Sequence, residues 1–246
     1  MITPSQARHT KPLPISENIA RVHERIAAAA GRAGRRPEDV SLMAVSKTFP
    51  PDRIREAYDE GIRLFGENRV QEFAGKSDAV RDLGHAEWHM IGHLQSNKVL
   101  KAAQLFTGVD SVDSVRLAEK LHAAAQQLGK KLPVLIEVNV GGESAKSGVE
   151  FDSPELEQML NAAPRLSNLE FRGLMTIPPF TEDPEGARSY FRHLRELRDQ
   201  IATRKLSAVH LETLSMGMSH DFEVAIEEGA TIVRIGRAIF GERPYI

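Results

Sequence analysis

The sequence predicts a single α/β domain, a closed barrel in which eight parallel strands alternate with helices. The length of 246 residues suits one such barrel. From Val40 onward, short β-rich runs alternate eight times with amphipathic stretches, without a break in composition. The runs are apolar enough to be strands buried on both faces. An open doubly wound sheet is the alternative, but it would leave polar edge strands, and none stands out.

A helix outside this repeat is expected near the N-terminus, beginning at Ser16. Its apolar positions recur at helical spacing, and glycines end it. These positions are Ile19, Val22 and Ile26, followed by Gly31 and Gly34. Residues 1–14 contain prolines and polar residues without an apolar signal-peptide core, so we expect a loose extension there. The barrel domain is then expected to span 15–246.

The remaining elements follow from alternating hydrophobic periods, with boundaries uncertain by about 2 to 4 residues. Strands are expected at 40–47, 62–66, 87–92, 105–110, 133–140, 169–176, 208–214 and 231–235. Helices are expected at 52–60, 67–82, 96–103, 114–128, 153–163, 184–203 and 219–228. Strand and helix alternation of this kind specifies parallel strands joined by right-handed crossovers.

The composition excludes several classes of function. Hydrophobic residues make up 41% of the chain, charged residues 27%, and the net charge is −2, so no basic excess attracts nucleic acid or a membrane surface. The absence of cysteine excludes disulfides, thiolate nucleophiles and thiolate metal sites, and favours the cytoplasm. No stretch reaches the roughly 18 apolar residues of a membrane span.

Lys47 ends the first predicted strand, directly before Thr48 and two prolines. The carboxyl ends of parallel strands are where α/β proteins bind ligands. A lysine partly desolvated there loses some of its preference for the charged form and becomes an amine nucleophile for a carbonyl. A solvated lysine that merely ends a strand is the structural alternative.

Arg234 lies in the last predicted strand, within an Ile-Val-Arg-Ile run. If the barrel closes, this strand lies beside the first strand, and Arg234 becomes a neighbour of Lys47. An arginine is costly to bury unless it is paired or hydrogen-bonded, because the guanidinium stays charged. A structural ion pair or a surface-facing side chain would also explain it.

The last two strands are followed by glycine-bearing segments that lead into helical turns. In barrels of this kind, such loops form a frequent phosphate site, where backbone N–H groups and the helix dipole favour an anion. Gly217 in the first segment and Gly236 in the second would let the backbone approach an anion, and Ser215 and Ser219 add hydroxyl donors. A tight turn with an N-cap serine would explain either segment without a ligand.

Other strand ends add polar groups to the same rim, including Asn68, Asn139 and the segment 92–98. His89 and His93 have the spacing of a helical metal pair. They fall across a strand and its loop, however, where that spacing does not place them on one face. We therefore expect no metal site.

Several segments together resemble the signatures of the pyridoxal phosphate homeostasis protein family. In order they are AVSKT at 44–48, GENRVQE at 66–72, WHMIGHLQSNK at 88–98, RGLM at 172–175, LSMGMS at 214–219 and IGRAIFG at 235–241. The match runs from about residue 16 to Gly241, and the combination is much more specific than any one segment.

The resemblance implies a barrel like the N-terminal domain of alanine racemase, carrying pyridoxal 5'-phosphate as an internal aldimine on Lys47. By the same resemblance, Ser215 and the amides near Gly236 and Arg237 would hold the phosphate, and Arg234 would face the pyridine nitrogen. Asn68 and Met216 join the cofactor-binding candidates through their motifs. Many relatives have threonine where this chain has Arg237, so a hydroxyl contact would become a guanidinium contact or be lost.

The segment 139–148 also fits the family, where its Lys146 is a candidate for a second or transient contact with the cofactor. An arginine at the pyridine nitrogen disfavours a second positive charge and weakens carbanion stabilisation. A racemase also needs a second acid/base group, commonly a tyrosine, and Tyr58, Tyr190 and Tyr245 are not at a predicted strand end that faces the pocket.

The resulting hypothesis is a protein that holds and buffers pyridoxal phosphate and delivers it to apo-enzymes, and that is more a binding protein than an enzyme. A weakly active amino-acid racemase is the first alternative. A lysine Schiff-base aldolase without a cofactor is the second. We expect a monomer, because a barrel without the second domain of the racemase loses one dimer contact.

Overall fold

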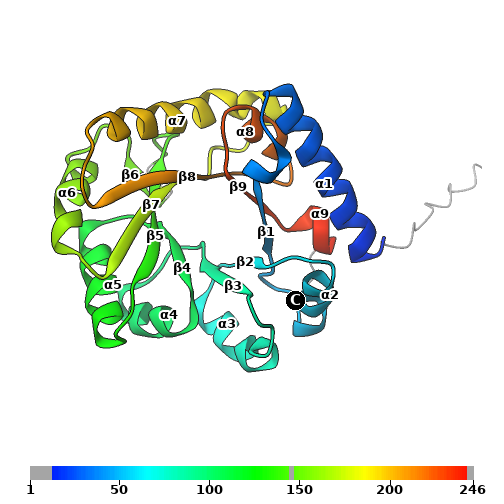
Figure 1. Ribbon diagram of the computed structural model, residues 1–246, viewed down its shortest axis with the longest axis horizontal. Coiled ribbons are helices and arrows are strands. Elements are labelled where there is room, and N and C mark those ends of the chain that lie inside the picture. Colours follow the sequence, from blue (N-terminus) through cyan, green and yellow to red (C-terminus); the bar gives the residue numbers. More distant parts are fainter. Residues whose placement is uncertain (1–12, 144–146, 243–246) are drawn as a thin grey trace, which may run out of the picture.

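The computed structural model describes residues 13–143 and 147–242, in which helices surround a barrel of parallel strands (Figure 1). The strands are β1 (Ser41–Val45), β2 (Leu64–Glu67), β3 (Glu87–Met90), β4 (Gly108–Val112), β5 (Leu132–Asn139), β6 (Val149–Glu150), β7 (Leu169–Met175), β8 (Val209–Met218) and β9 (Ile232–Ile235). The helices are α1 (Ile15–Arg32), α2 (Pro51–Asp59), α3 (Val70–Lys76), α4 (Val99–Leu105), α5 (Val115–Gln127), α6 (Pro154–Ala162), α7 (Arg188–Thr203), α8 (Phe222–Glu227) and α9 (Arg237–Phe240). Short 3-10 turns lie at Pro37–Asp39, Ser77–Val80, Ser96–Lys98, Ala163–Arg165 and Pro184–Ala187.

Strand pairing closes the barrel in both directions. β1 pairs with β2 on one side and with β9 on the other, and β4 pairs with β5, all in parallel. The eight-stranded closed barrel is therefore confirmed, and the open sheet is excluded. The two-residue strand β6, which the sequence did not predict, pairs with the end of β5 outside this circle.

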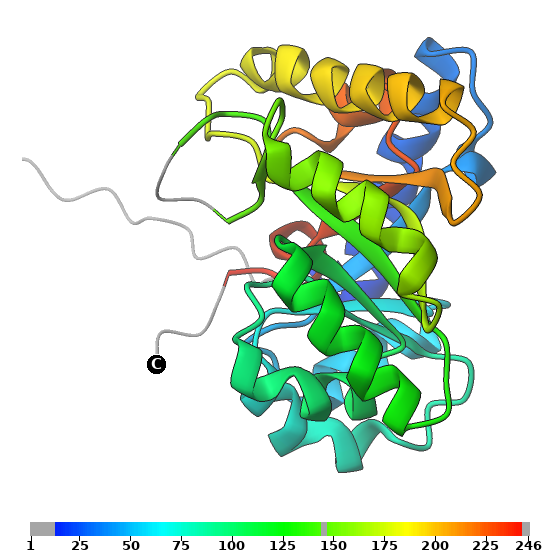
Figure 2. The same cartoon turned by 90° about the vertical axis from the view of Figure 1, so that its left-hand side faces the viewer.

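Side chains alternate between the inside and the outside of the barrel, as a strand period of two requires. On β1, Leu42 and Ala44 join the large core between strands and helices, whereas Met43 and Val45 pack inside the barrel with Ile91. Figure 2 shows α7, α6 and α5, coloured orange to green from top to bottom, along the outside of the strands. The barrel interior is thus left to a small apolar cluster and to polar groups.

The helix that precedes the repeat, α1, lies beside α8 and α9 (Figure 1). Its buried positions include the predicted Ile19, Val22 and Ile26. It begins at Ile15 rather than at Ser16, with Pro14 at the N-cap position and no side-chain cap. The predicted loose extension falls mostly on residues 1–12, outside the described part of the chain.

Most element boundaries differ from the predictions by a few residues, and three of these differences have a clear structural reason. The expected strand 105–110 is Gly108–Val112, because α4 continues through Leu105. The expected helix 67–82 begins only at Val70 and gives way to a 3-10 turn at Ser77, because Arg69 is still extended. The strand expected at 208–214 continues to Met218, so the segment predicted as a loop is strand.

Candidate functional site

A cavity of about 770 Å³ opens at the carboxyl ends of the strands. Of the seven cofactor-binding candidates that the family resemblance implied, five line it, namely Lys47, Asn68, Arg234, Gly236 and Arg237. They come from the ends of β1, β2 and β9, so neighbouring strands of the closed barrel bring together positions that are far apart in the sequence. A cavity of this size lies in the usual range for small-molecule sites.

Lys47 follows β1 by two residues and is half-buried. The strand alternation places it on the inward side with Met43 and Val45. Directly after it, Thr48 has a φ of 70°, a left-handed conformation that is uncommon for a residue with a branched side chain. The chain therefore turns away from the barrel at Thr48 and leaves Lys47 at the cavity.

Arg234 is 3% exposed and extends inside the barrel from β9. Its Nη1 donates to Ser215 Oγ at 2.9 Å, and its Nη2 donates to the Thr176 carbonyl at 2.8 Å. Burial lowers the pKa of Arg234 from its usual value, while Asp110 and Glu137 oppose this shift. An arginine starts from so high a pKa that it remains a cation here. Arg234 is thus a fixed positive charge at the bottom of the cavity.

Two acids lie deeper in the barrel near this cation. Burial, together with the charge of Asp113, raises the pKa of Glu137 to about 7, although Arg234 opposes the rise. Asp110 is hydrogen-bonded to His89 Nδ1 at 2.8 Å. Burial works against a charged His89, but Asp110 together with Glu87 raises the pKa of the imidazole.

Ser215 and Met216 do not line the cavity. β8 continues through both positions, and both side chains pack elsewhere. The Ser215 hydroxyl is fully buried and is an acceptor for Arg234, while the Met216 side chain belongs to the core between strands and helices. Gly217, also expected to face a ligand, instead allows helix α8 to approach, since a Cβ there would lie 2.6 Å from the Cβ of Ala225.

The end of β8 and the turn after it do reach the cavity, through Met218 and Ser219. Ser219 is the hydroxyl-bearing one of the two. Its hydroxyl accepts the backbone N–H of Ala238 at 3.4 Å, which links the end of β8 to α9. Gly236 and Arg237 line the same wall of the cavity. The sequence placed Ser219 in the correct segment but did not distinguish it from Ser215, because that distinction depends on where the strand ends.

Apolar residues of the cavity mouth were not predicted at all. Ile177 and Phe180 line it, and Phe180 is 80% exposed. The Phe180 ring lies 5.3 Å from the ring of His220, which also lines the cavity. These residues belong to the segments after β7 and β8, and only the assembled rim shows that they meet.

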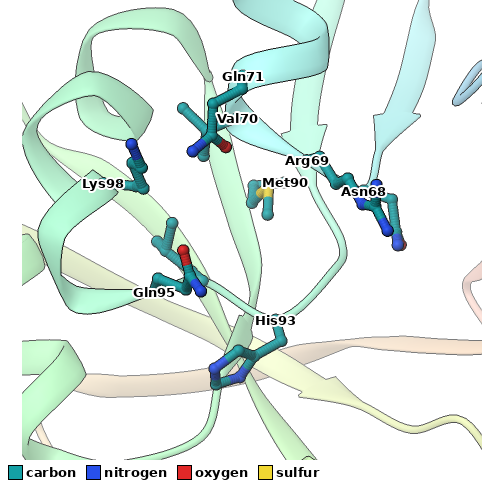
Figure 3. Close-up of a pocket in the computed structure, with 9 residues that line it drawn as sticks. Asn68, Arg69, Val70, Gln71, Met90, His93, Gln95 and Lys98 are labelled. Carbon is teal, nitrogen blue, oxygen red and sulfur yellow. The ribbon is translucent and has the colours of Figure 1, made fainter.

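A second, smaller pocket of about 360 Å³ adjoins the first and shares Asn68 with it. Figure 3 shows Gln71, Gln95 and Lys98 around Met90, with Arg69 beside Asn68 on the other side. The pocket has cationic and amide side chains and no acidic residue in its lining. Its electrostatics favour an anionic or polar group.

The two histidines considered for a metal are separate. His89 pairs with Asp110 inside the barrel, and His93 lies 3.2 Å from Asp113 at the rim. Over residues 13–143 and 147–242, no three histidines or acids gather as a metal site.

In the same part of the chain, no helix has the length and apolarity of a membrane span. Lys146 lies outside the described residues.

Comparisons with known proteins agree on one family. The family model of the alanine racemase N-terminal domain matches residues 18–244. A pyridoxal phosphate homeostasis protein of Aquifex aeolicus is 51% identical over 93% of this chain and 98% of its own length. Its counterpart in Escherichia coli K12 is 43% identical over 94% of this chain and 97% of its own length. The chain belongs to the pyridoxal phosphate homeostasis protein family.

Solved structures agree with this family assignment. PipY of Synechococcus elongatus, solved with pyridoxal phosphate bound, has a TM-score of 0.81 and 36% identity, and the match covers 92% of this chain and all of PipY. Alanine racemase of Corynebacterium glutamicum has a TM-score of 0.67 at 18% identity, over 92% of this chain and 62% of the racemase. The racemase match shows the shared barrel fold, which confirms the predicted architecture of the family.

Proposed function

We propose that this chain binds and buffers pyridoxal phosphate, with Lys47 as the point of covalent attachment. The observation that carries the proposal is that Lys47 and the buried Arg234 line one cavity at the carboxyl edge of the barrel. The names of the relatives and the ligand of PipY support the same cofactor.

The residues of the cavity fit this cofactor. Lys47 supplies an amine that can hold its aldehyde. Ser219, Gly236 and Arg237 form one wall with a hydroxyl, a position without a side chain and a guanidinium, a donor set suited to a phosphate. At Gly236 a Cβ would lie 3.3 Å from the Val45 carbonyl oxygen, so a larger residue would crowd Val45 of β1 at this wall. We assign phosphate binding to this wall rather than to Ser215.

Arg234 limits the reactions that bound pyridoxal phosphate could support. When bound, pyridoxal phosphate supplies a reactive aldehyde and an electron-accepting ring. We propose that Arg234 faces the ring nitrogen, where a fixed cation disfavours protonation and so weakens the ring as an electron acceptor. Such a site retains the cofactor and is poorly suited to turn over an amino acid.

The tyrosines of the described residues support the same conclusion. The Tyr58 hydroxyl donates to the Gly84 carbonyl, and Tyr190 lies on the outer helix α7. Neither lines the cavity, and Tyr245 lies outside the described residues. Efficient racemisation would need an acid or base on the face of the substrate opposite Lys47. We therefore propose a non-catalytic or very weakly active protein.

The test is spectroscopic. The purified chain, loaded with pyridoxal phosphate, is expected to show an absorption band of the lysine-bound cofactor, and borohydride should fix a phosphopyridoxyl group on Lys47 by mass. Lys47→Ala should remove both signals. Lys98→Ala, which alters a lysine of the adjoining pocket, is the matched control and should keep both. Retention of the band and the mass in Lys47→Ala would overturn the assignment.

Two further parts of the proposal concern the cell. We propose delivery of the cofactor to apo-enzymes in the cytoplasm, by a monomer. Transfer to a purified apo-enzyme that exceeds the rate of free exchange through solution would support delivery, and equal rates would contradict it. Light scattering with and without the cofactor measures the oligomeric state.

A further inference from the structure

The backbone on both sides of Lys47 is held by three buried or half-buried side chains of β2 and α3. We propose that Glu67, Glu72 and Lys76 are positioning residues, which fix the turn at residues 46–49 so that the Lys47 amine is presented to the cavity. This inference rests on the proposed function of Lys47.

Lys76 makes the central contacts of this arrangement. It is 8% exposed, and its Nζ donates to the Ser46 carbonyl at 3.0 Å and to the Phe49 carbonyl at 3.3 Å. These two carbonyls lie before and after Lys47 in the chain. One amine therefore spans the turn, and it also contacts the carboxylates of Glu67 and Glu72.

Glu72 holds the residue that follows Lys47. Its Oε1 accepts the backbone N–H of Thr48 and lies 3.3 Å from Lys76 Nζ. Thr48 has the left-handed φ of 70°, which a β-branched residue keeps only when its surroundings impose it. The carboxylate holds the Thr48 amide, and the Phe49 N–H, which donates to the Ser46 carbonyl at 3.1 Å, closes the same turn.

Glu67 holds the residue before Lys47. Its Oε1 accepts the Ser46 hydroxyl at 2.6 Å and lies 2.8 Å from Lys76 Nζ, and the side chain is fully buried. Burial raises the pKa of this carboxyl, although Lys76 and Ser46 oppose the rise. Within the described chain, its second oxygen has no hydrogen-bond partner. A buried acid with one oxygen that lacks a hydrogen-bond partner lowers the stability of the fold. The contact of its other oxygen with Ser46 is consistent with a role in positioning the turn.

The three side chains thus contact the segment 46–49 at Ser46, Thr48 and Phe49, while Lys47 within it lines the cavity. A lysine side chain has several rotatable bonds, so a fixed backbone on both sides reduces the entropy lost when its amine is held in place. Lys76 is itself engaged by two carbonyls and two carboxylates, so the amine offered to the cavity is that of Lys47.

The experiment separates positioning from simple stability. Glu72 is 29% exposed, so Glu72→Ala is expected to fold. We expect it to weaken the apparent affinity for pyridoxal phosphate by about tenfold, through loss of a charged acceptor. Thr48→Gly added to Glu72→Ala should recover at least about threefold of that loss, since glycine adopts a positive φ without a side-chain penalty. Thr48→Gly alone should change affinity less than about twofold by the same reasoning.

Glu228→Gln is the matched control. Glu228 is 4% exposed and is paired with Arg188, Arg192 and Arg195, remote from the turn in the chain. Its loss should lower the melting temperature yet leave the affinity of the folded protein unchanged. All affinities are titrated by absorbance at a temperature where circular dichroism shows every variant folded, and Lys47 modification is quantified by mass after borohydride.

The outcomes are distinct. An unsubstituted chain without the absorption band overturns the proposed function together with this inference. A normal band, with Glu72→Ala affinity equal to that of the unsubstituted chain, overturns the positioning role alone. Failure of Thr48→Gly to restore affinity in the Glu72→Ala background also overturns it. The positioning role is supported if the affinity falls in Glu72→Ala, recovers when Thr48→Gly is added, and is unchanged in Glu228→Gln.

Discussion

Arg234 donates a hydrogen bond from Nη1 to the Ser215 hydroxyl at 2.9 Å, inside the barrel. Both residues are buried, on the neighbouring strands β8 and β9. The loop expected after residue 214 would have placed this hydroxyl on a phosphate. Since the strand continues, the hydroxyl instead fixes one arm of the guanidinium that we assign to the ring nitrogen.

Ser215→Ala is therefore expected to change the spectrum of bound cofactor rather than the hold on its phosphate. Removal of the acceptor leaves Nη1 unpaired and costs about 1–3 kcal/mol of unfolding free energy. The absorption maximum should shift, while competition by inorganic phosphate should be unchanged. Ser219→Ala, on the cavity wall, should give the reverse pattern. A Ser215→Ala protein with weakened phosphate competition and a native spectrum would contradict this assignment.

Gly217 is expected to matter for packing and not for the ligand. Its φ is 92°, and a Cβ would lie 2.6 Å from the Ala225 Cβ and 2.9 Å from the Phe222 Cα. Gly217→Ala should cost about 2–4 kcal/mol of unfolding free energy, from backbone strain plus overpacking. Denaturant unfolding measures this loss.

Gly129→Ala is the control for strain alone. Gly129 has a φ of 63° with nothing within 4 Å of its Cβ position, so the substitution should cost only about 1 kcal/mol. Equal losses at the two glycines would show that contact with α8 is not what requires Gly217. The folded fraction of Gly217→Ala should bind pyridoxal phosphate with native affinity.

The fold could be predicted from the sequence because its periodicity is local. The apolar run that holds the outward Leu42 and the inward Met43 is visible in the chain itself, and such a run is typical of a strand buried on both faces. Closure of the barrel was predicted from the count of eight strand–helix repeats. Parallel pairing of β1 with β9 then placed Arg234 near Lys47, as expected.

The parts that could not be predicted depend on where each strand ends and on long-range polar contacts. Ser215 and Ser219 differ only in whether β8 has ended. Lys76 appeared as an ordinary residue of an amphipathic helix, but its amine is buried on carbonyls of a turn about 30 residues earlier. Glu137 lay unnoticed in a strand, since burial and the nearby charges exist only in the assembled barrel.

Phe180 is expected to slow release of the cofactor without stabilising the fold. It is 80% exposed at the mouth of the cavity, so Phe180→Ala should change unfolding free energy by no more than about 0.5 kcal/mol. The rate at which loaded protein loses its absorption band to a trapping amine should rise a few-fold. Leu100→Ala, another exposed apolar residue that does not line the cavity, should leave the rate unchanged. Equal rates in both variants would contradict a covering role.

Glu137 is expected to make the protein less stable as the pH rises. Burial raises its pKa from 4.5 to about 7, so between these values the native state binds more protons than the unfolded state. Unfolding free energy then falls as pH increases through this window. At 1.36 kcal/mol per pH unit, the total effect is on the order of 3 kcal/mol.

Glu137→Gln removes the titrating proton and keeps the shape of the side chain, which is 6% exposed. Relative to the unsubstituted chain, the variant should gain little at pH 4 and up to about 3 kcal/mol at pH 8, where the native carboxylate is charged. Urea unfolding at both pH values measures the difference. Glu150→Gln, at an exposed position on β6, is the surface control. A stability gain that is equal at pH 4 and pH 8 would mean that Glu137 is not the titrating group.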